Sequence, residues 1–269
     1  MNTYTIGADP ELFIFDPRDE KYLSSHNLIE GTKEDPFKVM CGATQVDGVS
    51  AEFNIDPCEN SGQFVNKIYT VMDVLKKMID AKSNSNHLVL KAIPVAYFDV
   101  DYFNSLPEET RLLGCTPDFN AYTGKQNEPP ITSECFRTGS GHVHVGGFQL
   151  SNNYEEDIKN RVKQLDYTLY PISLIWDKDQ KRRELYGKPG AFRYKPYGFE
   201  YRVLSNKWVG NEELQKWVFE ATKRAMELYD QGEELYDHTP PEDGYEYEYI
   251  ESYSDMLVRE YDFPDLKVR

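Results

Sequence analysis

The chain has 269 residues, of which 39% are hydrophobic and 14% aromatic, so it can bury the core of one large domain or two small ones. Its formal net charge of -16 argues against nucleic-acid binding by general phosphate neutralisation, so an anionic ligand would need a local cluster of basic residues. No signal peptide and no run of about 18 apolar residues is found, so we expect a soluble cytoplasmic protein that does not enter a membrane.

The N-terminal third has clear secondary-structure patterns. The first fifteen residues alternate as in a pair of strands, or as in one strand bent at Pro10. Residues 43–54 predict a hairpin, because an Asp-Gly turn joins two short alternating segments. Apolar residues recur at helical spacing over 62–81, and "HLVLKAIPVAYF" (87–98) predicts a buried strand.

The middle of the chain is irregular, and further strands and helices are predicted after it. Residues 99–138 contain several prolines and predict a long connection, which within a domain is often functional. "GHVHVGGFQL" (141–150) predicts a strand and 153–176 a helix. "FEYRVLSN" (199–206) predicts a further strand and 211–233 the last long helix.

The C-terminal stretch 240–255 is acidic and rich in tyrosine, which predicts a solvated or edge-packed tail. Strands and helices are interspersed without strict alternation, and no linker separates two parts of the chain. We therefore predict one α+β domain over 1–269 with a mostly antiparallel sheet.

Charged residues recur with a period of two inside the predicted strands, between apolar neighbours. One sheet face would then be apolar and covered by helices, and the other would carry the charges. Clustered carboxylates repel each other unless a proton or a cation intervenes, and oxygen ligands with an occasional imidazole suit magnesium or manganese. The residues are Asp9, Glu11, Glu52, His142, His144, Glu200 and Arg202.

A basic cluster lies between residues 178 and 207, where nine Lys and Arg residues are opposed by three acids. Arginine binds phosphate through two parallel hydrogen bonds, and the glycines of "TGSGHVHVGG" (138–147) let a ligand approach the backbone. Carboxylates that hold a metal, together with arginines and glycines, are typical of phosphoryl transfer. Three lysines of this cluster, Lys188, Lys195 and Lys207, are interpreted as solvated charges.

Four motifs in order resemble a known family: "GADPELFIFD", "VDGVSAEFN", "GSGHVHVGG" and "RRELYGKPGAFRYKPYGFEYRVLSN", all within residues 6–206. They are similar to the phage-type COOH·NH2 ligases, amidoligases related to glutamine synthetase and glutamate-cysteine ligase. The resemblance implies a glutamine synthetase-like fold, in which a curved, mostly antiparallel sheet has helices on its convex face. ATP and Mg2+ or Mn2+ would bind on the concave face. Residues 207–269 would add a helix and the acidic tail.

The resemblance also implies roles for individual residues. The metal ligands would be Asp9, Glu11, Glu52, His142 and Glu200. Nucleotide or phosphate contacts would come from His144, Arg182, Arg183, Arg193 and Arg202, and Arg202, Arg193 and Glu52 would be catalytic. Asp9 departs from the glutamate of glutamine synthetases, so its side chain reaches less far.

The predicted function is an ATP-dependent carboxylate-amine ligase that forms an amide through an acyl phosphate. Its partners would be small-molecule or peptide carboxylates and amines, in the host cytoplasm if the chain is phage-encoded, with oligomerisation left open. The alternatives are a guanidino-type phosphotransferase on the same fold and a non-catalytic binding protein. A third is a metal-dependent hydrolase built on His142 and His144, although the further histidines of such a site are missing.

Overall fold

The structure is a computed structural model that describes residues 3–111, 118–128, 135–149, 151–236 and 247–266. The strands are β1 (Thr5–Asp16), β2 (Lys21–Leu23), β3 (Phe37–Val39), β4 (Gly42–Asp47), β5 (Ser50–Ile55), β6 (Val89–Lys91), β7 (Val95–Tyr97), β8 (Phe119–Asn120), β9 (Phe136–Thr138), β10 (Gly141–Gly146), β11 (Ala191–Lys195) and β12 (Gly198–Tyr201). The helices are α1 (Ser61–Ser83), α2 (Val100–Ser105), α3 (Glu108–Arg111), α4 (Tyr154–Thr168), α5 (Tyr170–Trp176), α6 (Lys181–Leu185), the 3-10 helix η1 (Asn206–Gly210), α7 (Glu212–Asp230) and α8 (Tyr247–Tyr261).

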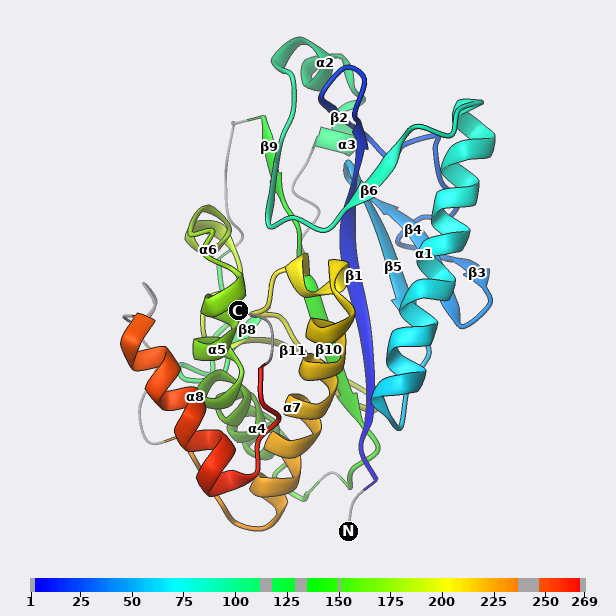
Figure 1. The fold of residues 1–269 in the computed structure, drawn as a ribbon. Helices are drawn as coiled ribbons and strands as arrows, with labels where there is room; N and C mark the ends of the chain where they lie inside the picture. Colours follow the sequence, from blue (N-terminus) through cyan, green and yellow to red (C-terminus); the bar gives the residue numbers. More distant parts are fainter. Residues whose placement is uncertain (1–2, 112–117, 129–134, 150, 237–246, 267–269) are drawn as a thin grey trace.

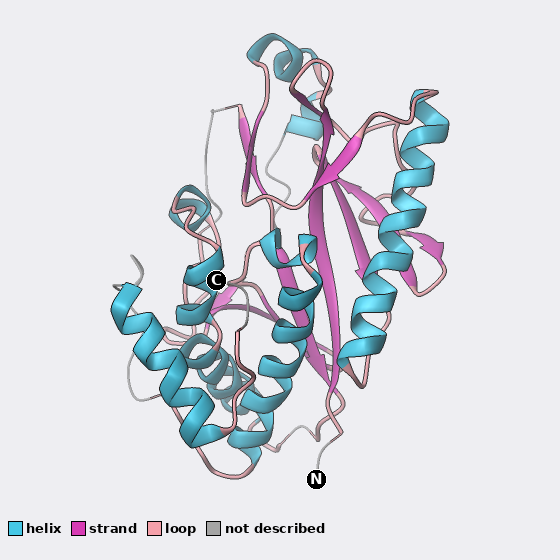
Figure 2. Cartoon of the chain, in the orientation of Figure 1, coloured by secondary structure: helices cyan, strands magenta, loops and turns pink. Residues whose placement is uncertain are grey.

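The main sheet has the strand order β3-β4-β5-β1-β10-β12-β11-β8, and its pairings are antiparallel. β1 is the long central strand, and its C-terminal half also pairs with β2 and β6 (Figure 2). It runs through Pro10 without a break, since Pro10 pairs with Gly141 in the ladder. The prediction of an α+β chain with a mostly antiparallel sheet is confirmed; its glutamine synthetase-like form stays a prediction.

Alternation along the strands gives the sheet one apolar and one polar face. On β1, Ile6, Ala8 and Leu12 are buried in the core, together with Val143 of β10 and Phe199 of β12. The long helices α1, α4 and α7 cover this face of the sheet (Figure 1). The opposite face is free of these helices, and it carries the charged residues that the period of two singled out.

Three predicted strands are shorter than expected. Within its described residues, the segment 141–150 is a strand only over Gly141–Gly146. The segment 87–98 forms two strands in different sheets, because β6 pairs with β1 and β7 pairs with β9. Pro94 lies between them and has no N–H to continue a ladder. The segment 199–206 leaves the sheet after Tyr201, where the N–H of Arg202 still donates to Ala191 O at 3.0 Å.

The helical predictions also need two corrections. The single helix expected over 153–176 is two helices, α4 and α5, and Pro171 is the second residue of α5. The stretch predicted as a solvated or edge-packed tail is helical from residue 247 onward, where α8 begins, and it is packed on one side; residues 240–246 lie outside the described ranges. Ile250, Tyr253 and Leu257 of α8 are buried at helical spacing, and Tyr253 donates a hydrogen bond to Tyr167 O at 2.8 Å.

Helices that could span a bilayer are absent from the described part of the chain.

Candidate active site

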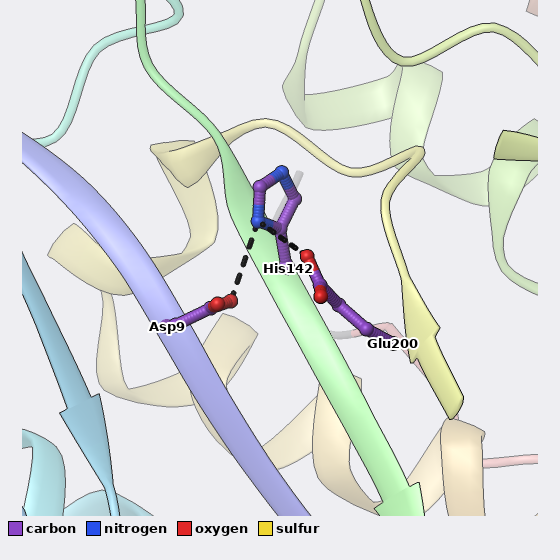
Figure 3. A group of neighbouring side chains, drawn as sticks. All are labelled: Asp9, His142 and Glu200. Atoms are coloured by element: carbon purple, nitrogen blue, oxygen red, sulfur yellow. Dashed lines mark ion pairs between the residues drawn. The ribbon is translucent and has the colours of Figure 1, made fainter. Parts of the chain in front are cut away.

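Strand pairing places the predicted acids and histidines side by side on the polar face. Asp9 of β1 pairs with His142 of β10, and His144 of β10 pairs with Glu200 of β12. Figure 3 shows Asp9, His142 and Glu200 reaching from three adjacent strands toward one point. We call these three residues the cation cluster.

The contacts within the cation cluster are short and shielded from water. His142 Nδ1 lies 3.3 Å from Asp9 Oδ1 and 3.3 Å from Glu200 Oε1. His144 Nε2 lies 3.0 Å from the same oxygen of Asp9. The side chain of Glu200 is 0% exposed and that of His142 is 5% exposed, so these charges interact with little solvent screening.

The charge states within the cation cluster follow from burial and neighbouring charges. Burial, and then the positive charge of Arg202, lowers the pKa of His142 to about 4, so its imidazole is neutral at pH 7. Burial and Asp9 would raise the pKa of Glu200, but Arg202 and the two histidines lower it to about 2. Burial opposes ionisation of Asp9 too, yet His144 and His142 hold its pKa well below the usual value. Two carboxylates thus face a neutral imidazole.

This donor set fits a divalent cation. One ligand atom from each of Asp9, His142 and Glu200 can be chosen so that all lie within 4.8 Å of one another. Within the described residues, Asp9 Oδ1 and Glu200 Oε2 are buried and have no well-aligned hydrogen bond, although His144 Nε2 and Lys195 Nζ lie within 3.0 Å of them, so each oxygen can still bind a cation. Carboxylate oxygens and one neutral imidazole are ligands that magnesium and manganese accept.

The other two predicted metal ligands form a separate pair. Glu11 pairs with Glu52 across β1 and β5, outside the cation cluster. Glu11 accepts the N–H of Ser140 at 2.8 Å, and Glu52 accepts a hydrogen bond from Gln45 Nε2 at 2.8 Å. Burial, and then the charge of Asp47, raises the pKa of Glu11 to about 7, and burial with the neighbouring carboxylates raises that of Glu52 well above its usual value. This pair therefore binds protons readily.

Two of the predicted arginines lie at the cation cluster. The Arg202 Nη1 donates to Glu200 and lies 3.2 Å from His142 Nδ1, while its Nε lies 3.3 Å from Asp118 Oδ2. The Arg193 Nη1 lies 3.9 Å from Glu200 Oε1. Sequence patterns gave no signal for Asp118, an acid in the middle of the proline-rich connection over 99–138, although its contact with Nε helps to orient Arg202.

Arg182 and Arg183, in contrast, contact other parts of the protein. The Arg182 guanidinium is buried, and it donates to Val203 O at 2.8 Å and to Arg202 O at 3.3 Å. Arg183 Nη1 lies 3.5 Å from Asp177 Oδ2. Arg182 thus holds the backbone that follows β12, and the structure does not bring these two arginines to the pocket described next.

A pocket of 450 Å³ lies on the polar face beside the cation cluster. Its charged wall includes Asp9, Glu52 and His144, and the Tyr197 hydroxyl is in hydrogen-bond contact with His144 Nδ1. Asp56 and Lys195 also line the pocket, and the remaining wall is apolar or neutral. The full lining is Thr5, Gly7, Ala8, Asp9, Gln45, Glu52, Asn54, Ile55, Asp56, Pro57, His144, Gly146, Lys195 and Tyr197.

Lys195 is a pocket residue that the sequence interpretation missed. The prediction that it is a solvated charge is wrong, because its Nζ lies 2.7 Å from the buried Glu200 Oε2 and its side chain is 28% exposed. The spacing Arg193-x-Lys195 was the available signal, since a period of two places both residues on the polar face of β11. Tyr197, near the turn between β11 and β12, was not singled out either.

The buried neutral His142 lies between two carboxylates, one of which, Asp9, also lines the pocket, and two arginines lie close by. This is the composition of an enzyme active site. Residues 131–252 match the family model described as phage phiEco32-like COOH.NH2 ligase-type 2. The matched segment contains the third and fourth sequence motifs. The match covers less than half of the chain; it supports the predicted amidoligase family and, in general terms, carboxylate-amine ligation with small-molecule substrates. No curated protein matches the chain.

Proposed function

We propose that the protein is an ATP-dependent carboxylate-amine ligase that works through an acyl phosphate. The observation that carries this proposal is the position of the cation cluster, which shares Asp9 with the wall of a 450 Å³ pocket. Arg193 and Arg202 flank the same cluster through Glu200. Acids that can hold a cation, with guanidinium groups beside them, are the groups that phosphoryl transfer requires.

Asp9, His142 and Glu200 would hold Mg2+ or Mn2+. When bound, such a cation neutralises phosphate oxygens and orients the phosphoryl group. His144 is held between the Tyr197 hydroxyl and Asp9 Oδ1, so it fixes the position of that carboxylate.

The pocket supports the binding of a nucleotide. Its 450 Å³ volume lies within the range of roughly 300–1,000 Å³ that is usual for small-molecule sites. Gly7 and Gly146 contribute no side chain to its wall, and Ile55 and Pro57 are apolar. A Cβ atom on Gly146 would lie 3.0 Å from Tyr197 O and 3.3 Å from Thr5 Oγ1, so glycine lets these two pocket residues approach β10 closely. A planar base fits such a surface, with the phosphates directed to the charged wall.

The chemistry has two steps. An oxygen of the substrate carboxylate bonds to the γ-phosphorus of ATP as the bond to the β-phosphate oxygen breaks, which gives an acyl phosphate and ADP. The nitrogen of a neutral amine then bonds to the acyl carbon, the bond to phosphate breaks, and the nitrogen loses one proton. Arg193 and Arg202 would stabilise the negative charge in both steps. Glu52, in the pocket wall, would accept the proton.

The test is ADP release across a grid of carboxylates and amines, with mass detection of products. ADP should form slowly with ATP alone and rapidly when both substrates are present. The product should be one water lighter than the sum of the two substrates. Arg202→Lys should lower the rate by at least about a hundredfold, because lysine cannot make the contacts of a planar guanidinium with Glu200 and Asp118. Arg183→Lys is the matched control and should retain activity.

The competing functions give different results in this assay. A phosphotransferase would leave the phosphate on a stable acceptor and form no amide. A non-catalytic binding protein would release no ADP with any pair of substrates. Either outcome would contradict the ligase proposal.

A further inference from the structure

The hairpin formed by β11 and β12 brings a lysine to the charged wall of the pocket. Lys195 is the last residue of β11, and it pairs with Gly198 of β12. Among the described residues that line the pocket it is the single Lys or Arg, whereas Asp9, Glu52 and Asp56 are acids. General solubility does not explain why a lysine lies in this acidic pocket wall.

The contact between Lys195 and Glu200 does not use all the bonding capacity of the ammonium group. Lysine has three N–H donors on one nitrogen. The Nζ of Lys195 is in ion-pair contact with Glu200 Oε2 at 2.7 Å, yet that oxygen has no aligned hydrogen-bond donor among the described residues. The side chain also keeps 28% of its surface exposed and lines the pocket. Donors therefore remain for a ligand in the pocket.

We propose that Lys195 binds a phosphate of the nucleotide directly and distinguishes a phosphorylated ligand from the nucleoside. The inference rests on the proposed use of ATP. A phosphate held between the cation cluster and Lys195 would meet positive charge from two sides, since Glu200 belongs to the cation cluster and contacts the lysine. Lysine acts here as a compact point charge, a common way to bind phosphate.

Another role for Lys195 would be to neutralise Glu200 without touching a ligand, and the two roles have different consequences. Lys195→Met removes a positive charge beside a residue of the cation cluster, so the affinity for Mn2+ alone should stay the same or rise in either case. If the lysine only neutralises Glu200, the affinity for ATP should follow that of Mn2+ and should not fall. If it contacts phosphate, the affinity for ATP should fall although Mn2+ still binds.

Titration calorimetry with four probes tests the inference: Mn2+ alone, then ATP, inorganic triphosphate and adenosine at saturating Mn2+. Lys195→Met should weaken the binding of ATP and triphosphate tenfold or more, as expected for the loss of a charge-assisted hydrogen bond. Its affinity for adenosine should stay within twofold of the wild type. Lys195→Arg should recover part of the lost affinity. Lys207→Met, which removes an exposed lysine of the same basic cluster, should bind all four probes like the wild type.

Unchanged affinity of Lys195→Met for ATP and triphosphate would overturn the inference, and so would an equal loss for adenosine. If the wild type binds ATP and the variant binds it equally well, only the inference fails. If the wild type binds neither ATP nor triphosphate in the presence of Mn2+, the proposed use of ATP fails with it. Thermal unfolding of each variant would show whether the fold is kept.

Discussion

A buried carboxyl behind the sheet should make stability depend on pH in an unusual direction. Asp166 of α4 is 0% exposed; its Oδ2 accepts the N–H of Gly190 at 2.5 Å and its Oδ1 accepts the Tyr201 hydroxyl at 2.8 Å. These bonds tie the start of β11 to the end of β12, the two strands that carry Arg193 and Glu200. Burial is the main cause that raises the pKa of Asp166 from 3.8 to about 7.

The direction of this pH dependence follows from the number of protons that the folded and unfolded states bind. Between pH 3.8 and about 7 the folded protein holds a proton on Asp166 that the unfolded chain has released, so stability falls as pH rises through this window. Each pH unit changes the free energy of unfolding by about 1.4 kcal/mol, so the interval from pH 5.5 to 7 should contribute about 2 kcal/mol. Asparagine stays neutral at every pH, so Asp166→Asn should lack this contribution.

Urea denaturation of the wild type and of Asp166→Asn at several pH values between 5.5 and 8 measures the effect. The difference in unfolding free energy, wild type minus variant, should decrease by about 2 kcal/mol from pH 5.5 to 7 and level off above it. A constant loss in the variant, from the weakened hydrogen bond to Gly190, would shift the curve without changing its slope. If the two stability profiles run parallel across this range, Asp166 is ionised in the folded protein and the reasoning is wrong.

Three further predictions concern the cation cluster, the core and α8. His142→Ala should weaken Mn2+ binding tenfold or more in calorimetry, because it removes the imidazole between the carboxylates of Asp9 and Glu200; wild-type affinity would contradict the cation cluster. Phe64→Ala should lower the free energy of unfolding by about 3–5 kcal/mol in urea denaturation, since the ring is fully buried. Leu257→Ala should cost about 2–5 kcal/mol, whereas the exposed α8 substitution Glu251→Ala should stay within about 0.5 kcal/mol. Equal effects of these two substitutions would show that α8 is not packed on the domain.

The period of two was sufficient to place the cation cluster on one face of the sheet. Asp9, His142 and Glu200 each lie between apolar neighbours, and in a strand that pattern fixes the direction of a side chain. The same reasoning put Glu11 and Glu52 on the correct face. It could not show that they pair with each other, because the register between β1 and β5 is set by tertiary packing.

The residues that were misjudged depend on how distant segments meet. Arg182 and Lys195 both belong to the basic cluster, and composition cannot tell which one is buried against the carbonyl oxygen of Val203 and which one lines the pocket. Asp118 reaches Arg202 only because the irregular connection returns to the edge of the sheet at β8. The helix α8 was missed because acidic and tyrosine content obscured the spacing of its three buried residues.

The central position of β1 has a consequence for how the protein is made. Its neighbour β10 follows more than a hundred residues later in the chain, and β12 later still. The ribosome therefore synthesises β1 well before β10, the strand that pairs with one of its two edges. Pairing between strands so far apart in the sequence is also slow to form. Until then the edge is open to association with other chains. Synthesis of β10 is thus the step at which the nascent chain stops being prone to aggregation at this edge.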